Sequence, residues 1–113
     1  MQIPKQYNSL VPLTESSFYI LISLAEPLHG YGIIQKIEGM SGGRVRMGAG
    51  TLYGALTNLT ELGLIQRVGK QSGRRKNYQI TREGKTLVEL EIERMEELIC
   101  NAKGALQMEG EIE

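Results

Sequence analysis

Two residue types are missing from this chain of 113 residues, and cysteine and histidine each occur only once. The sequence has no tryptophan and no aspartate, and it contains one cysteine, Cys100, and one histidine, His29. A single thiol cannot form an intrachain disulfide and fits a reducing compartment. One histidine and one thiol without aspartate cannot assemble a usual zinc site or a Ser-His-Asp triad. We therefore expect no metal, no cofactor and no enzyme active site.

Long apolar runs are also lacking. No uncharged apolar segment approaches the roughly 20 residues that a membrane-spanning helix needs. The first residues lack the apolar core of a signal peptide. The sequence therefore predicts a cytoplasmic protein with no membrane partner and one modest hydrophobic core.

A net charge of zero hides a strong asymmetry along the chain. Residues 1–82 contain ten lysine or arginine residues and four glutamates, whereas residues 83–113 contain three cations and nine glutamates. The first part can approach phosphate, and the second part would be repelled by it. Between Leu62 and Arg82 there are six cations and no acid, which favours contact with nucleic acid over a merely solvated surface.

Hydrophobic periodicity predicts three helices after an irregular arm at residues 1–13. Thr14 is a good N-cap for the first helix, and Pro27 should end that helix. We expect a turn at residues 29–32, a short strand at residues 44–47, and a third helix at residues 50–62. The core-facing residues are predicted to be Phe18, Leu21, Ile22 and Ala25, then Ile33, Ile34, Ile37 and Met40, and finally Leu52, Ala55, Leu56 and Leu59.

The outer face of the third helix is the strongest candidate for a binding surface. Its residues are short or uncharged, and most can form hydrogen bonds: Thr51, Tyr53, Gly54, Thr57 and Asn58. A helix with this face can lie deep in the major groove of DNA, whereas an ordinary solvent-facing helix would carry more lysine and glutamate. Arg44 and Arg46, just before this helix, are weaker candidates for contact with the DNA backbone.

A basic hairpin is predicted to follow, with strands at residues 65–69 and 77–81. Tyr78 and Ile80 fall on one face of it by alternation. The loop carries four cations that would reach phosphates or the neighbouring minor groove: Lys70, Arg74, Arg75 and Lys76. A charged hairpin tip is often only a solvated loop, but its position directly after the third helix favours a DNA-binding wing.

One long helix is predicted from Arg82 to about Gln107, followed by a frayed acidic tail. Apolar residues recur along it at steps of four and three: Val88, Ile92, Met95, Ile99, Ala102 and Leu106. A core of this size cannot cover so long a stripe, so we expect it to pair with a second copy of the chain. The alternative is full burial of the stripe against the chain's own first helix.

Taken together, these segments resemble the PadR family of transcriptional regulators. The resemblance spans about residues 13–108, with matching segments at residues 13–15, 24–32, 48–56, 63–65, 74–78 and 80–84. Its specific part is the order of HGYG (residues 29–32), GTLYGAL (residues 50–56) and RRKNY (residues 74–78). It implies an α+β, mainly α fold. Residues 1–82 would form a winged helix-turn-helix of three helices and a two-stranded wing, and residues 83–113 a C-terminal dimerisation helix with an acidic tail.

The resemblance also implies a homodimeric repressor that binds a two-fold symmetric operator in double-stranded DNA. Many relatives respond to small aromatic or cationic effectors, and some compact relatives stack flat ligands on a tryptophan of the last helix. The absence of tryptophan argues against a similar stacking pocket here. A winged-helix module that holds another protein is the alternative function, and the cations of residues 74–76 favour DNA over it.

Overall fold

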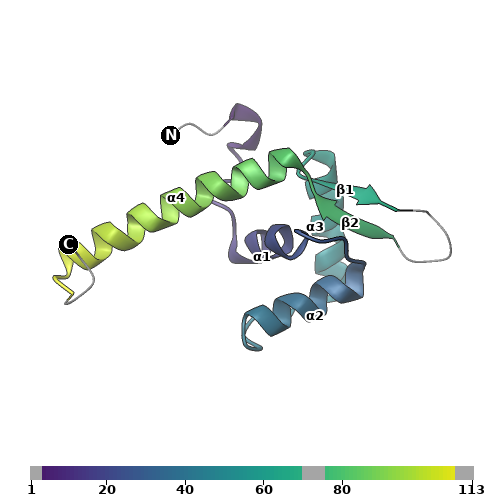
Figure 1. Ribbon diagram of the computed structural model, residues 1–113, viewed down its shortest axis with the longest axis horizontal. Coiled ribbons are helices and arrows are strands. Elements are labelled where there is room, and N and C mark those ends of the chain that lie inside the picture. Colours follow the sequence, from purple (N-terminus) through teal and green to yellow (C-terminus); the bar gives the residue numbers. More distant parts are fainter. Residues whose placement is uncertain (1–3, 70–75, 109–113) are drawn as a thin grey trace.

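The structure is a computed structural model that describes residues 4–69 and 76–108. Four α-helices and one antiparallel hairpin make up a mainly helical α+β fold (Figure 1). The elements are, in chain order, the 3₁₀ helix η1 (Lys5–Tyr7), α1 (Glu15–Ser23), α2 (Gly30–Met40), α3 (Ala49–Glu61), β1 (Ile65–Val68), β2 (Asn77–Ile80) and α4 (Arg82–Ala105). This order confirms the predicted winged helix-turn-helix followed by a long helix.

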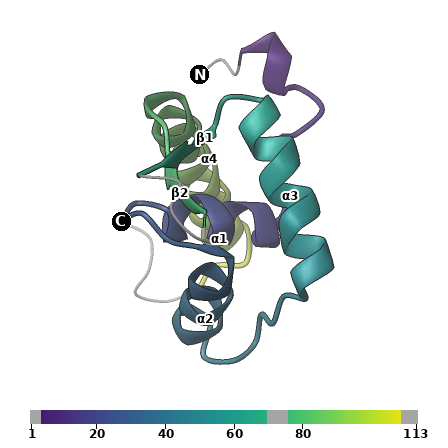
Figure 2. The same ribbon diagram turned by 90° about the vertical axis from the view of Figure 1, so that its right-hand side faces the viewer.

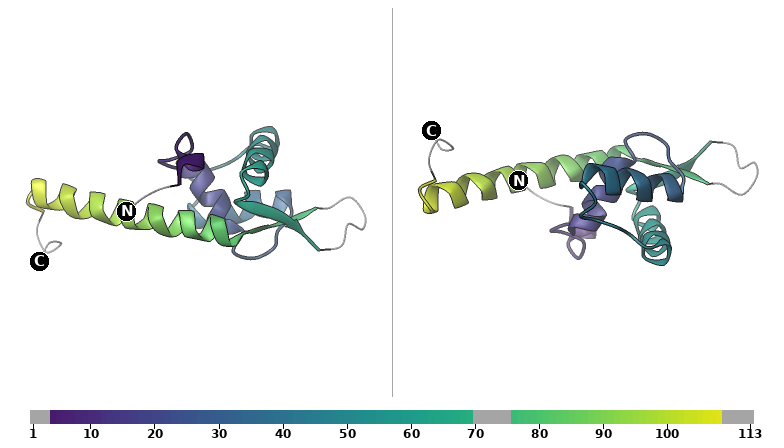
Figure 3. Two further views of the ribbon diagram at one scale, coloured as in Figure 1. Left: turned by 90° about the horizontal axis from the view of Figure 1, so that it is seen from above. Right: turned by 90° about the horizontal axis from the view of Figure 1, so that it is seen from below.

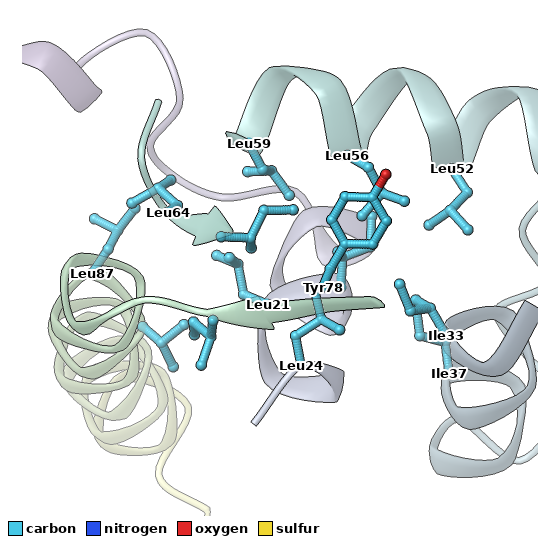
Figure 4. Packing of buried hydrophobic residues seen from close by; sticks show 14 of the residues in the cluster. Leu21, Leu24, Ile33, Ile37, Leu52, Leu56, Leu59, Leu64, Tyr78 and Leu87 are labelled. Atoms are coloured by element: carbon cyan, nitrogen blue, oxygen red, sulfur yellow. The ribbon is translucent and has the colours of Figure 1, made fainter. Parts of the chain in front are cut away.

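The hydrophobic core lies where α1, α2 and α3 meet the hairpin (Figure 4). Leu52, Leu56 and Leu59 of α3 are buried as predicted, and Ala55 is half-buried. Figure 4 shows Tyr78 of β2 extending toward the leucines of α3. Because α3 contributes its whole leucine face to this core, its opposite face is turned outward.

The buried face of α1 differs from the predicted one. Thr14 caps the helix as expected, since its hydroxyl oxygen accepts a hydrogen bond from the backbone N–H of Ser17 at 3.1 Å. The helix then ends at Ser23, and its residues contact both α2 and α4. Two packing partners bury more than one stripe, so Ile20, Leu21, Ser23 and Leu24 are buried, Phe18 and Ile22 are half-buried, and Ala25 is exposed.

The turn predicted at residues 29–32 is wrong, because α2 already begins at Gly30. The backbone of Leu28 exchanges hydrogen bonds with that of Tyr78, at 3.0 and 2.8 Å. This bridge holds the segment before α2 against the hairpin. His29, in an extended conformation, is then the N-cap residue of α2. At the other end of α2, Met40 is exposed rather than buried, since the last turn extends beyond the core.

Two smaller predictions about irregular segments are also wrong. Residues 44–47 form no strand, and the sheet of the described residues consists of β1 and β2 alone. The arm before α1 contains η1, and its Tyr7 is only 4% exposed because it packs into the core. Neither outcome follows from local periodicity, since both depend on which distant element offers a partner.

The hairpin leads directly into α4. Ile65 pairs with Ile80 and Arg67 with Tyr78, and the alternation buries Tyr78 and Ile80 as predicted. Thr81 caps α4 by accepting a hydrogen bond from the Gly84 N–H at 3.0 Å, and its own hydroxyl donates to the Gly63 carbonyl at 2.7 Å. The wing and the long helix are therefore joined rigidly.

The C-terminal half of α4 projects away from the rest of the fold, as both views of Figure 3 show. The radius of gyration is 16.0 Å, whereas a compact domain of this length would have about 13 Å. Val88 is buried, but Ile92, Ile99 and Leu106 are 40%, 53% and 72% exposed. The alternative of full burial against α1 is therefore wrong. None of the described helices is both long and apolar enough to pass through a lipid bilayer.

Candidate nucleic-acid interface

The outer face of α3 lies along one edge of the molecule (Figure 2). All five residues predicted to form it are exposed: Thr51, Tyr53, Gly54, Thr57 and Asn58. The only charged residue of α3 is Glu61, at its last position. The helix therefore presents an uncharged polar surface about three turns long, a shape and chemistry that suit the major groove.

Side chains of this face keep hydrogen-bonding groups that contacts among the described residues do not use. The Thr57 hydroxyl donates to the Tyr53 carbonyl at 3.0 Å, which leaves its oxygen lone pairs available as acceptors. The Asn58 amide offers both donors and an acceptor, the combination that reads adenine in a major groove. A Cβ atom placed on Gly54 would meet no atom within 4 Å, so the surface is open at this point.

Tyr53 is the largest residue of this face, and it is 50% exposed. Its ring lies against Gly30, the first residue of α2, where a side chain would collide with it. The ring of Tyr53 therefore connects the outer face of α3 with the first residue of α2.

The wing extends from the end of the fold opposite the C-terminal end of α4 (Figure 1). Of its four predicted contact residues, Lys76 is exposed beside β2, whereas Lys70, Arg74 and Arg75 lie outside the described residues. Arg67 is one of the six cations from Leu62 to Arg82, but the sequence did not single it out as a DNA contact. Arg67 is exposed on β1, and within the described parts of the chain neither Arg67 nor Lys76 forms an ion pair.

Arg44 and Arg46 are exposed, but each is paired with a glutamate. Both terminal nitrogens of the Arg44 guanidinium contact the Glu15 carboxylate, with Nη1 3.0 Å from Oε1. These hydrogen bonds hold the pKa of Glu15 below its ordinary value. Arg46 Nε lies 3.5 Å from Glu38 Oε2. A glutamate therefore partly offsets the charge of each of these two arginines.

Glu91, which the sequence did not single out, is a buried acid between α1 and α4. Its side chain is 1% exposed. The carboxylate accepts hydrogen bonds from Leu13 N at 2.8 Å and from Arg94 Nε and Nη2 at 2.9 and 3.0 Å. The bonds from Arg94 and Leu13 outweigh the effect of burial and lower the pKa of Glu91. The sequence does carry a signal for this burial. Glu91 follows Leu87 by four residues and Val88 by three, so it lies on the same face of the helix as these two buried residues.

A cavity of about 410 Å³ lies beside this carboxylate, between α1 and α4. Apolar and aromatic side chains supply most of its wall, and Glu15 and the Glu91–Arg94 pair supply its charged groups. Its lining residues are Leu13, Glu15, Phe18, Tyr19, Ile22, Glu91, Arg94 and Met95.

This arrangement defines a class of protein, a winged helix-turn-helix whose third helix presents an uncharged polar face beside a basic hairpin. Within this class, residues 19–90 match the transcriptional regulator PadR-like family. The chain belongs to this family, which confirms the resemblance found in the sequence. The family is one of transcriptional regulators.

Solved structures of the family share the fold. A PadR-like transcription factor from Bacteroides fragilis is 28% identical, with a TM-score of 0.66 over 80% of this chain and 88% of the other. A PadR family regulator from Eggerthella lenta is 26% identical, with a TM-score of 0.63 over 84% and 83%. Bacillus subtilis PadR, solved in complex with operator DNA, is 24% identical, with a TM-score of 0.58 over 69% and 46%.

One relative is known from its sequence. An uncharacterized 37.1 kDa protein in transposon TN4556 of Streptomyces fradiae is 38% identical over 85 residues, which are 74% of this chain. The match covers 24% of that protein, so this chain spans about a quarter of its length.

Proposed function

We propose that the protein is a homodimeric repressor that binds a two-fold symmetric DNA operator in the cytoplasm. Residues 1–82 would form the DNA-binding part, and residues 83–113 would join two copies. The observation that carries this proposal is the outer face of α3, exposed over its length and uncharged except at Glu61. The operator complex of Bacillus subtilis PadR, which has the same fold, supports a similar use of this fold here.

In this proposal α3 enters the major groove and the wing contacts the DNA backbone. Thr51, Tyr53, Thr57 and Asn58 contact bases and adjacent phosphates, and Gly54 permits close approach of the helix. Arg67 and Lys76, together with Lys70, Arg74 and Arg75, supply phosphate contacts. Such contacts give salt-dependent affinity with little sequence information, so specificity comes mainly from α3.

The test of this function is selection of bound DNA from a random pool with the purified protein. We expect a two-fold symmetric site whose half-sites lie about 34–36 Å apart, one turn of B-DNA. Enrichment of no sequence, at any salt concentration, would refute sequence-specific binding. A stable complex with another protein in place of DNA would then support the interaction module.

The roles of individual residues can be tested on the selected site. Asn58→Ala should change the preferred base at one position of each half-site, whereas Asn101→Ala on α4 should change nothing. Arg67→Ala and Lys76→Ala should weaken binding to all sequences and reduce the salt slope by about one for each phosphate that is no longer neutralised. Lys85→Ala, which removes an exposed cation of α4, is the matched control.

The proposed dimer is built from the part of the α4 stripe beyond Glu91, which contains the half-buried Met95 and the exposed residues Ile92, Ile99, Ala102 and Leu106. Ile99→Glu would place a charge in this seam and should convert the dimer to a monomer in sedimentation velocity. Asn101→Glu adds the same charge about 200° around the helix, so it should leave the assembly unchanged. Equal assembly states for both variants would contradict this seam.

The cavity between α1 and α4 is the place where we propose that a small aromatic effector binds. Its largely apolar lining suits a flat ligand, and Glu15 and the Glu91–Arg94 pair offer polar groups to it. Planar aromatic compounds that raise the melting temperature of the wild-type protein should have no such effect on Ile22→Trp, which fills the cavity. Equal shifts for both proteins would place the ligand elsewhere.

A further inference from the structure

Gly30, at the start of α2, lies directly against the ring of Tyr53 of α3. Gly30 is buried, and a Cβ atom on it would overlap the Tyr53 hydroxyl oxygen. The same Cβ atom would lie 2.8 Å from Cζ and 3.3 Å from Cε1 of the ring. Carbon atoms at optimal contact are about 3.5–4.0 Å apart. No residue with a side chain can therefore occupy this position while Tyr53 keeps its place.

The backbone does not explain a glycine here. Gly30 has none of the positive φ angles that favour glycine, which occur at Gly42, Gly43, Gly63 and Gly69. In a helix glycine is disfavoured relative to alanine. The next glycine of the same turn, Gly32, would hold a Cβ atom at 3.5 Å from its nearest neighbours, an ordinary contact. The ring of Tyr53 is thus the feature that requires glycine at position 30.

The contact with Gly30 bears on the conformational freedom of the Tyr53 side chain when it binds a partner. One edge of its ring is covered by α2, while half of the side chain remains exposed on the outer face of α3. A tyrosine on a bare helix surface samples several rotamers and loses that freedom on binding. Contact with Gly30 restricts the ring before binding, so its hydroxyl group is already placed.

We propose that Gly30 is a positioning residue for DNA recognition, which acts by holding Tyr53 in one orientation at the interface. The proposal rests on the proposed function of α3, because it assigns Tyr53 a contact with DNA. Gly30 itself needs no contact with DNA. Its effect on affinity passes entirely through the ring of Tyr53, and this separates it from a residue that only supports the fold.

The test compares Gly30→Ala with Gly32→Ala. In protein labelled with ¹³C in its tyrosine rings, Gly30→Ala should shift the Tyr53 resonances by NMR, and Gly32→Ala should leave them in place. On a fluorescent duplex selected by the wild-type protein, Gly30→Ala should weaken binding about two- to tenfold per protomer, the range expected for freeing one ordered side chain. Gly32→Ala should bind like wild type.

A double-mutant cycle with Tyr53→Ala decides whether Gly30 acts through the ring. Gly30→Ala should cause no further loss of affinity when Tyr53 is already alanine. If Gly30→Ala lowers the melting temperature, Tyr53→Ala should restore it, because the colliding ring is gone. An equal loss of affinity in both backgrounds, or unmoved ring resonances, would overturn the proposal.

The two proposals fail in different ways. A wild-type protein that selects no duplex refutes the function assigned to α3, and the role of Gly30 in recognition is refuted with it. A wild-type protein that binds its selected duplex, beside a Gly30→Ala variant that binds equally well, refutes the role of Gly30 alone.

Discussion

Replacement of Glu91 by glutamine tests the contact that joins the start of α1 to α4. The substitution keeps the size of the side chain and removes its charge. In the wild-type protein the buried carboxylate accepts hydrogen bonds from Leu13 N and from two nitrogens of Arg94. A glutamine has one carbonyl oxygen to offer, and its NH₂ group cannot accept from the guanidinium.

The size of the effect follows from these bonds. Hydrogen bonds to charged groups contribute about 1.5–3 kcal/mol, and Arg94 is 33% exposed and can regain water. Since one acceptor remains, we expect Glu91→Gln to lower the free energy of unfolding by about 2 kcal/mol at pH 7. Urea unfolding at a fixed protein concentration measures this difference. Glu93→Gln, an exposed neighbour, should change it by less than about 0.5 kcal/mol.

The pH dependence gives a second readout of the same group. Because the pKa of Glu91 is lowered from 4.5 in the folded protein, the unfolded chain takes up a proton at a higher pH than the folded chain. The contribution of the carboxylate to stability is therefore complete above about pH 4.5 and is lost as the pH falls through the lowered pKa. The difference between wild type and Glu91→Gln should shrink over that window. A constant difference from pH 7 to pH 3, or none at pH 7, would refute this reasoning.

Three further predictions concern the joints of the fold and the assembly. Gly84→Ala would place a methyl group against the Leu64 carbonyl and 2.6 Å from Ile80 Cγ1, so it should destabilise the fold by about 1–3 kcal/mol in thermal unfolding. Gly104→Ala is the control, because a Cβ atom there would meet no neighbour within 4 Å among the described residues and should not destabilise the fold. Thr81→Ala removes the N-cap of α4 and the hydrogen bond to the Gly63 carbonyl, so it should lower the free energy of unfolding by about 1–2 kcal/mol, measured by urea unfolding. The melting temperature of the wild-type protein should rise with concentration if α4 pairs two copies; a constant value would oppose a dissociable dimer.

The third helix was predictable because its apolar and polar residues alternate with the period of an α-helix. Leucines at steps of four and three define the inner side, and the residues between them must then face outward. The hairpin was predictable for a similar reason, since alternation at Tyr78 and Ile80 fixes which side of each strand is buried. Local periodicity therefore sufficed to place the candidate interface of α3 on the surface.

Periodicity failed where a distant partner decides the outcome. The start of α2 at Gly30 depends on the backbone bridge between Leu28 and Tyr78, which are 50 positions apart in the sequence. The burial of Tyr7 depends on its packing against the core that the helices form. The pairing of Arg44 with Glu15 likewise joins residues 29 positions apart. No local pattern carries this information.

The apolar pattern of the long helix is buried along only part of its length. Its heptad-like stripe predicts a single seam, but the structure divides it at about Glu91. Before that point, Leu87 and Val88 are buried within the chain's own fold, and the buried carboxylate fastens α4 to the start of α1. Beyond it Met95 is half-buried beside the cavity that α1 lines, whereas Ile92, Ile99 and Leu106 are exposed. A charge introduced at Val88 would therefore damage the monomer, whereas a charge at Ile99 reports on the assembly alone.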